Sequence, residues 1–199
     1  MMLKRLVLLV MLAPLAWPAV GQEVKGVILD EPSPVKSFTL VDHKGDPFTL
    51  DQLKGRWSLV FLGFTHCPDV CPFTLANLEA VRGELSQLVV PERLPQVVFL
   101  AVDPDRDRKV LADYVAHFDL SFVGVTGERD EIDSLTESLD AFYRLEKKSE
   151  DDDAYDVTHT AAVAVVTPKG SVKAKLSPPF KPYETAAYLL RLMRGMETN

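Results

Sequence analysis

Apolar and polar positions change their period several times along the chain, and each change predicts a new strand or helix. Nearly continuous apolar runs at 57–64 and 96–102 are typical of central strands that are covered on both faces. Apolar residues three and four positions apart predict amphipathic helices over 72–89 and 182–194. In chain order, the predicted elements are a short hairpin (38–41 and 47–50), a strand (57–64), a helix (72–89), a strand (96–102), a second helix, a strand (122–125), a third helix, a hairpin (160–166 and 171–176) and a last helix (182–194). The second helix is predicted from an apolar stripe of Val110, Leu111, Tyr114, Val115 and Phe118, and the third from Ile132, Leu135, Leu139 and Phe142. The last helix is expected to bury Tyr183, Ala187, Leu190 and Met193 or their neighbours.

The order of these elements predicts an α/β fold. Strands that are joined by a crossover helix lie parallel, whereas the last hairpin adds antiparallel strands at an edge. The expected architecture is a mixed central sheet flanked by helices, with an added N-terminal hairpin, in an order similar to that of thioredoxin-like proteins. In such sheets, chemistry collects beyond the carboxyl ends of the central strands.

The first residues have the pattern of a secretory signal. Lys4 and Arg5 precede an apolar run from Leu6 to Val20, which is shorter than the roughly 20 residues that a spanning helix needs. We predict cleavage after Gly21 and export to the bacterial periplasm or the outer face of the inner membrane. The alternative is an uncleaved signal anchor that tethers the protein to the membrane. The chain then divides into a signal peptide or anchor (1–21), an extended leader (22–36) and a folded domain (37–199).

Composition narrows the functional classes. The chain has 199 residues, with 22 Lys and Arg against 29 Asp and Glu, which gives a net charge of −7. Loss of Lys4 and Arg5 with the signal leaves 20 minus 29, or −9. This balance excludes a nonspecific nucleic-acid binder, because that affinity comes from Lys and Arg on phosphates. The two cysteines, Cys67 and Cys71, lie too close together to be the disulfide framework of a small secreted scaffold.

Both cysteines follow the first central strand, where the next helix begins. Pro72 fits the first helical position, so Cys71 is expected at the helix cap and Cys67 in the preceding turn. The positive end of the helix dipole lowers a thiol pKa there and favours thiolates. Two thiolates one turn apart can bind one soft ion, Cu(I) or Zn(II). A disulfide or a pair of inert buried thiols explains the spacing equally well.

A complete metal site needs a further ligand, and the chain has four histidines. His66 adjoins Cys67, but neighbouring side chains tend to point apart. His43 and His117 are expected in a turn and at a helix end, where a structural role suffices. His159 stands just before a buried strand, a position from which a loop can reach the neighbouring strand end. Its spacing alone does not identify it as a ligand.

Three segments form a more specific set. They are Gly63-Phe-Thr-His-Cys67-Pro-Asp-Val-Cys71-Pro, Val102-Asp-Pro-Asp-Arg-Asp107 and Tyr155-Asp-Val-Thr-His159. In this order they resemble the Sco/SenC family of copper metallochaperones, and the resemblance covers residues 35–195. It implies a thioredoxin-like fold in which Cys67, Cys71 and His159 bind copper, as Cu(I) or Cu(II). Residues 37–199 are then a thioredoxin-like copper-binding domain.

The resemblance also implies a partner. Family members deliver copper to the CuA centre of cytochrome c oxidase subunit II, or act on its cysteines as thiol reductants. That subunit, or another copper-receiving protein, is therefore the expected partner. One departure is visible, because the family commonly has Asp before its histidine and this chain has Thr158. Asp156 is the candidate substitute for that carboxylate.

Other functions stay open at this point. In an exported thiol–disulfide oxidoreductase, Cys67 would attack a substrate disulfide and Cys71 would resolve it, although the spacing differs from the usual C-x-x-C. A structural Zn(II) site is disfavoured because such sites are closed, with four ligands. A peroxiredoxin is disfavoured because Thr65 stands two residues before Cys67, where that family has three. A metallochaperone is not an enzyme, so catalysis enters only with the oxidoreductase.

Overall fold

The structure is a computed structural model that describes residues 24–149, 152 and 154–197. The predicted signal peptide or anchor, 1–21, lies outside the described residues. The strands are β1 (Gly26–Pro34), β2 (Thr39–Asp42), β3 (Pro47–Thr49), β4 (Ser58–Gly63), β5 (Gln96–Ala101), β6 (Val123–Thr126), β7 (Tyr143–Leu145), β8 (Val157–His159), β9 (Val163–Val166) and β10 (Ser171–Leu176). The helices are α1 (Leu50–Leu53), α2 (Val70–Ser86), the 3-10 helix η1 (Pro91–Arg93), α3 (Pro104–Asp107), α4 (Leu111–Ala116), α5 (Arg129–Ser138) and α6 (Pro182–Glu197).

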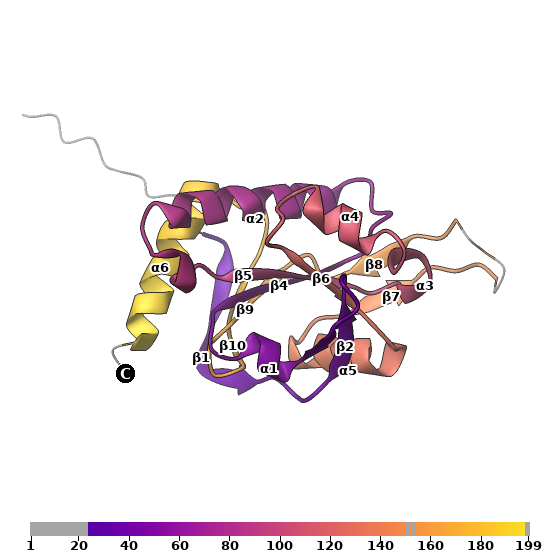
Figure 1. The fold of residues 1–199 in the computed structure, drawn as a ribbon, viewed down its shortest axis with the longest axis horizontal. Coiled ribbons are helices and arrows are strands. Elements are labelled where there is room, and N and C mark those ends of the chain that lie inside the picture. The colour runs from indigo at the N-terminus through magenta and orange to yellow at the C-terminus, as the bar shows by residue number, and fades with distance from the viewer. Residues whose placement is uncertain (1–23, 150–151, 153, 198–199) are drawn as a thin grey trace, which may run out of the picture.

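A mixed sheet forms the centre of the molecule. Its strand order is β1-β10-β9-β4-β5-β6-β2-β3. β4, β5 and β6 are parallel, whereas β9, β10 and the N-terminal β2–β3 hairpin pair antiparallel. Figure 1 shows α2 and α4 on one side of the central strands and α1 and α5 on the other. The predicted α/β class with a mixed sheet and an added N-terminal hairpin is therefore confirmed.

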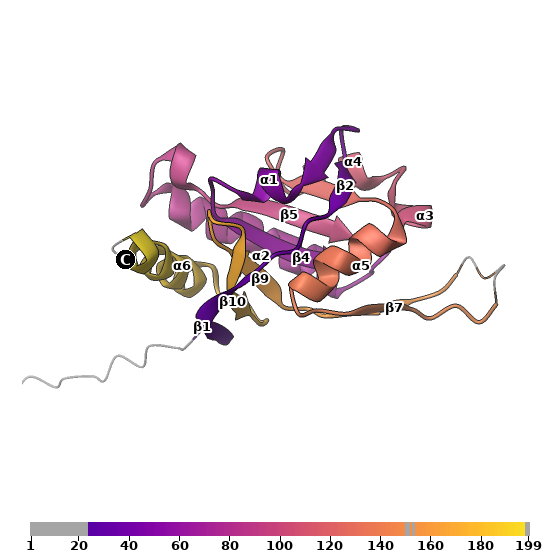
Figure 2. The ribbon, with the colours of Figure 1, turned by 90° about the horizontal axis from the view of Figure 1, so that it is seen from below.

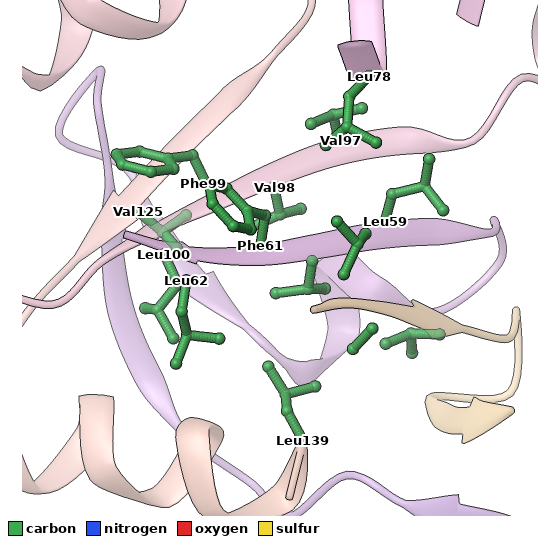
Figure 3. Close-up of a cluster of buried hydrophobic side chains, with 14 of the residues drawn as sticks. Leu59, Phe61, Leu62, Leu78, Val97, Val98, Phe99, Leu100, Val125 and Leu139 are labelled. Atoms are coloured by element: carbon green, nitrogen blue, oxygen red, sulfur yellow. The ribbon is translucent and has the colours of Figure 1, made fainter. Parts of the chain in front are cut away.

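The core is built around β4 and β5. Every residue of these two strands is buried, as their continuous apolar sequences predict for strands covered on both faces. Figure 3 shows Leu78 of α2 packing on one side of this pair and Leu139 on the other. Because β4, β5 and β6 are parallel, their carboxyl ends meet at one edge of the sheet. The loops that leave this edge lie side by side.

The range predicted as an extended leader, 22–36, contains β1. This strand pairs antiparallel with β10, from Gly26 opposite Leu176 to Pro34 opposite Ser171. It forms one edge of the central sheet. Among the described residues, no helix is both long enough and apolar enough to cross a bilayer.

Two of the predicted helices differ from those in the structure. The apolar stripe predicted as one helix from Val110 to Phe118 contains only the short helix α4, Val110 is exposed, and α3 lies in the acidic stretch before the stripe. The next predicted helix includes Phe142, but α5 ends at Ser138 and Phe142 is exposed. Asp140, with φ of 46°, occupies the left-handed region that commonly ends a helix. The predicted periodicity therefore continued past the true end of α5.

The last helix is confirmed, and only one residue of its predicted buried face is wrong. α6 begins at Pro182 and buries Met193 as predicted, Ala186 and Leu189 are buried next to the predicted Ala187 and Leu190, and Tyr183 is exposed. The final antiparallel hairpin is also confirmed, although β9 begins at Val163 rather than at residue 160.

The residues before β9 form an element that the apolar pattern did not predict. β7 and β8 pair antiparallel in a separate two-stranded sheet, in which Tyr143 is opposite His159 and Leu145 is opposite Val157. Figure 2 shows this pair, here called the ribbon, extending away from the rest of the molecule. His159 is the last residue of the ribbon and lies at its base.

Candidate metal centre

The first half of the candidate centre is the loop between β4 and α2, residues 64–69, here called the cysteine loop. It leaves the carboxyl end of the buried strand β4 and turns at once, with the Cys67 N–H donating to the Phe64 carbonyl at 3.2 Å. The Cys71 N–H points at Cys67 Sγ, 3.4 Å away. Both sulfurs therefore lie at the start of α2, at the sheet edge where chemistry was expected.

The start of α2 corrects one prediction. The helix begins at Val70, so Cys71 is its second residue and Pro72 its third, rather than the cap and the first. The first four N–H groups of a helix have no partner within the helix, so proline fits anywhere in the first turn. Cys71 is consequently held on the buried side of the helix instead of at its open end.

Close packing around Cys71 depends on Gly63. A Cβ atom at this position would lie 2.8 Å from Cys71 Sγ and 2.7 Å from Phe99 Cε2. Both distances are shorter than van der Waals contact. The absence of a side chain at the end of β4 therefore lets the Cys71 sulfur pack against the sheet.

The second half of the centre is His159, from the base of the ribbon. Its Nδ1 lies 3.0 Å from the Thr160 carbonyl, which can only accept a hydrogen bond. Nδ1 therefore carries the proton, and Nε2 has a free lone pair, 3.4 Å from Cys71 Sγ. The rings of Phe61 and Phe64 contact the imidazole edge to face, with centroids 5.9 Å and 6.2 Å away.

The three candidate ligands come together. Cys67 Sγ, Cys71 Sγ and a ring nitrogen of His159 all lie within 4.8 Å of one another. Cys71 is buried, whereas Cys67 and His159 are only partly buried, so one side of the group remains accessible. Among the described residues, no other group of three or more cysteine, histidine or acidic side chains has ligand atoms close enough together to bind one metal ion. His43, His66 and His117 are not part of it.

Burial shifts the pKa values of Cys71 and His159 in opposite directions. It raises the pKa of the Cys71 thiol well above its usual value, and a backbone hydrogen bond at Phe64 acts in the opposite direction. The predicted lowering of the thiol pKa at the helix start is therefore wrong for Cys71, whose pKa is raised mainly by burial. Burial also lowers the pKa of His159, which favours the neutral imidazole that a metal requires.

The departure at Thr158 falls on the side of the ribbon that faces solvent. Side chains alternate along a strand, so Thr158 points away from the face that carries His159. Its hydroxyl donates to Glu146 Oε1 at 2.9 Å, and the side chain is exposed. Asp156 is also exposed and does not join the group of candidate ligands. A carboxylate at position 158 would therefore face the ribbon surface rather than the metal site.

The sequence reasoning gave no role to several polar residues that contact both halves of the centre. Asp103, Arg106 and Asp107 lie in the loop and short helix after β5, and Tyr155 lies just before β8. Asp103 and Asp107 are fully buried, and burial raises the pKa of Asp107. These residues belong to two of the segments that carried the family resemblance. Their position in those segments was the feature of the sequence that could have indicated a role at the site.

Sheet order, cysteine loop and ribbon together define an α/β protein with a Cys2His centre at the carboxyl end of its central strands. The family model described as SCO1/SenC matches residues 29–194, so the chain belongs to the SCO1/SenC family.

Relatives with similar sequences agree with this membership. Human "Protein SCO1 homolog, mitochondrial" is 34% identical over 73% of this chain and 52% of its own length. The chain thus spans about half of the human relative. A protein of Stutzerimonas stutzeri named "Putative copper-binding protein" is 33% identical over 78% of this chain and 74% of its own length.

Solved structures share the fold. Yeast Sco1 with copper bound superposes with a TM-score of 0.74 and 26% sequence identity, over 82% of this chain and 90% of that chain. This likeness confirms the thioredoxin-like fold that the order of elements predicted.

Proposed function

We propose that this chain binds one copper ion through Cys67, Cys71 and His159 and passes it to another protein. The observation that carries the proposal is the convergence of two thiol sulfurs and one imidazole nitrogen within 4.8 Å. Cys71 and His159 are 88 positions apart in the chain, yet their ligand atoms lie 3.4 Å from each other. The structural relative from yeast has copper bound, which supports the same cargo here.

The donor set suits copper. Thiolate sulfur is a soft ligand that favours Cu(I), and imidazole binds copper in both oxidation states. Cu(II) prefers additional nitrogen or oxygen ligands, which water can supply at the accessible side of the group. A receiving protein must exchange ligands with the bound ion, so one side has to stay accessible. Partial exposure of Cys67 and His159 meets this requirement.

Titration of the reduced protein with Cu(I), in competition with a chelator of known affinity, tests the binding step. We expect one copper per chain, loss of tight binding in Cys71→Ser, and weakened binding in His159→Ala. His66→Ala is the matched control, because His66 adjoins Cys67 but is exposed and contacts the Thr65 hydroxyl instead. Equal affinity of wild type and His159→Ala would contradict the ligand assignment.

We further propose that the receiver is the CuA site of cytochrome c oxidase subunit II. Membership of the SCO1/SenC family supports this choice of partner. Mixing the Cu(I)-loaded protein with the copper-free CuA domain and separating the two proteins again tests it, with the copper content of the CuA domain as the readout. We expect transfer from the wild type and none from Cys71→Ser. Copper that stays with the wild-type chain while the CuA domain remains empty would contradict this receiver.

A second candidate function is thiol–disulfide exchange on a partner protein. Both cysteines are free, and only Cys67 is partly exposed, which suits an attacking thiol backed by a buried resolving thiol. His159 separates the two functions. His159→Ala should weaken copper binding and leave the rate of disulfide exchange by Cys67 unchanged.

We place this activity in the bacterial periplasm or at the outer face of the inner membrane. Lys4 and Arg5, followed by the apolar run of 6–20, support export with cleavage after Gly21 or retention as a membrane tether. Cell fractionation, combined with N-terminal sequencing of the isolated protein, tests both alternatives. Recovery of the uncleaved chain in the cytoplasm would contradict export.

A further inference from the structure

One short stretch of chain contacts both halves of the metal centre. Residues 103–107, here called the bridge segment, follow β5 and include α3. They leave the same sheet edge as the cysteine loop, because β4 and β5 are parallel neighbours. The bridge segment contains two fully buried carboxylates, Asp103 and Asp107, and each of them binds a different half of the centre.

Asp107 binds the cysteine loop. Its Oδ1 accepts the Thr65 N–H at 2.8 Å and the Thr65 hydroxyl at 2.7 Å. Its Oδ2 accepts the Asp103 N–H at 3.2 Å. Thr65 stands two residues before Cys67, so this carboxylate determines where the backbone of the cysteine loop passes.

Asp103 and Arg106 bind the residue that leads into β8. The Tyr155 hydroxyl donates to Asp103, with both carboxylate oxygens 2.8 Å away. The Arg106 guanidinium pairs with Asp103 and lies 3.7 Å above the Tyr155 ring. Arg106 Nη1 also donates to the Tyr155 carbonyl at 2.9 Å. Hydroxyl, ring and carbonyl of Tyr155 are thus all held, four residues before His159.

Contacts with the rest of the molecule are more important for holding the ribbon in place than for holding the cysteine loop. The ribbon strands pair only with each other, and a two-stranded sheet by itself is marginally stable. A buried ion pair contributes little net stability relative to well-packed apolar side chains, so its role here lies in the geometry that it specifies. The ion pair of Asp103 and Arg106 lies within the bridge segment and orients both side chains toward Tyr155, whose contacts with them join the base of the ribbon to the sheet edge.

We propose that the bridge segment sets the distance between the two thiolates and the imidazole. Asp107 positions the cysteine loop through Thr65. Arg106, together with Asp103, positions His159 through Tyr155. These are positioning residues that do not touch the metal, and the inference rests on the proposed copper binding by this centre.

The experiment is a double-mutant cycle with Cu(I) affinity as the readout. Arg106→Ala and Tyr155→Phe are each measured in the wild-type background and in His159→Ala. Tyr155→Phe removes a single hydroxyl and keeps the ring, so it tests the same contact where Arg106→Ala fails to fold. The matched control is Arg144→Ala, because Arg144 lies on the ribbon and pairs only with its neighbour Glu146 in the described contacts.

We expect both bridge variants to lower the affinity about tenfold in the wild-type background, as loss of outer contacts to metal ligands does. In His159→Ala, Tyr155→Phe should cause no further loss, since it acts through that side chain. Arg106→Ala should lose much less there than in the wild-type background, because its other contact with the centre is the Phe64 ring of the cysteine loop, 5.7 Å from the guanidinium. Arg144→Ala should change neither background. Thr65→Val should weaken binding in both backgrounds, because it acts on the cysteine loop. An equal loss for Arg106→Ala and Tyr155→Phe in both backgrounds, or no loss in either, would overturn the proposal.

A measurement without metal separates this inference from the proposed function. In the metal-free protein, Arg106→Ala and Tyr155→Phe should shift the imidazole NMR signals of His159, whereas Arg144→Ala should not. Such shifts in a protein that binds no copper would refute the proposed function and retain the positioning. Unchanged His159 signals in both bridge variants, with copper binding intact, would refute the positioning and retain the function.

Discussion

The two halves of the metal centre are built in different ways. Cys67 lies in the loop between β4 and α2 and Cys71 in the first turn of α2, and both elements pack directly into the central core. His159 comes from a ribbon that pairs only with itself and projects from the body in Figure 2. Core packing holds the sulfurs, whereas the imidazole is held by the Phe61 and Phe64 rings and by the buried polar contacts of Tyr155, which lies just before its strand. A metal bound to all three ligands would therefore fasten a peripheral element to a rigid one.

The largest expected effect comes from opening the core beneath the cysteines. Phe61→Ala removes a fully buried ring of β4 that also contacts the His159 imidazole. Urea unfolding should show a loss of about 3–5 kcal/mol in the free energy of unfolding, because a cavity is left. Phe73→Ala is the matched control in α2, since Phe73 is exposed, and its effect should stay within about 0.5 kcal/mol. Similar losses in both variants would contradict the assignment of stability to this core.

A smaller loss of stability is expected from a substitution at the end of β4, where the strand packs against the Cys71 sulfur. Gly63→Ala places a methyl group 2.8 Å from Cys71 Sγ. The neighbouring side chains must move to make room for it. The free energy of unfolding should fall by about 1–3 kcal/mol, with weaker Cu(I) binding. Gly83→Ala in α2 meets no atom within 4 Å and should instead raise stability by about 0.5–1 kcal/mol. Unchanged copper affinity in Gly63→Ala would show that Cys71 tolerates displacement.

The two halves of the metal centre should contribute differently to the pH dependence of copper binding, because Cys71 has to lose a proton at neutral pH whereas His159 does not. Burial raises the pKa of Cys71, so its thiol is protonated at neutral pH and must lose that proton to bind the metal. Burial lowers the pKa of His159, so its imidazole is already neutral there. Cu(I) binding should weaken by at least about 1.4 kcal/mol for each unit that the pH falls below neutral conditions.

Chelator competition at several pH values measures this slope, and Cys71→Ser provides the comparison. In that variant the proton contributed by Cys71 disappears, so the remaining affinity should depend less steeply on pH. A wild-type affinity that is independent of pH would show that Cys71 is already a thiolate, or that it does not bind the metal.

The smallest effect is expected on the outer face of the ribbon. Thr158→Asp restores the residue that is common in the family at a position pointing away from His159. The new carboxylate would face Arg144, its cross-strand partner, and also lie near Glu146, so attraction and repulsion largely cancel. Stability should change by less than about 0.5 kcal/mol and copper affinity by less than about twofold. A large gain in affinity would mean that this face of the ribbon contributes to the site.

The central strands of the sheet were easier to predict from the sequence than the strands of the ribbon, because they are more deeply buried. Strands buried on both faces, such as β4 and β5, need continuous apolar sequences, and those runs are visible without any structure. β7 and β8 have three residues each and are only partly buried, so they leave almost no periodic signal. The site divided along the same line. The cysteine pair was visible from its position after a buried strand, whereas His159 became a candidate ligand only with the family resemblance.

The sequence by itself determined the α/β class, the central strands and the cysteine pair, because burial pattern and spacing are local properties of the chain. Only the tertiary structure decided which histidine meets the sulfurs and what holds it there. Cys71 and His159 are 88 positions apart, and Arg106 reaches the Tyr155 carbonyl across 49 positions. Contacts of that range depend on how parallel strands bring their loops to one edge. Tertiary burial likewise set the protonation of Cys71, since loss of water raises the pKa of a thiol for which the local sequence, at a helix start, predicts a lowered one.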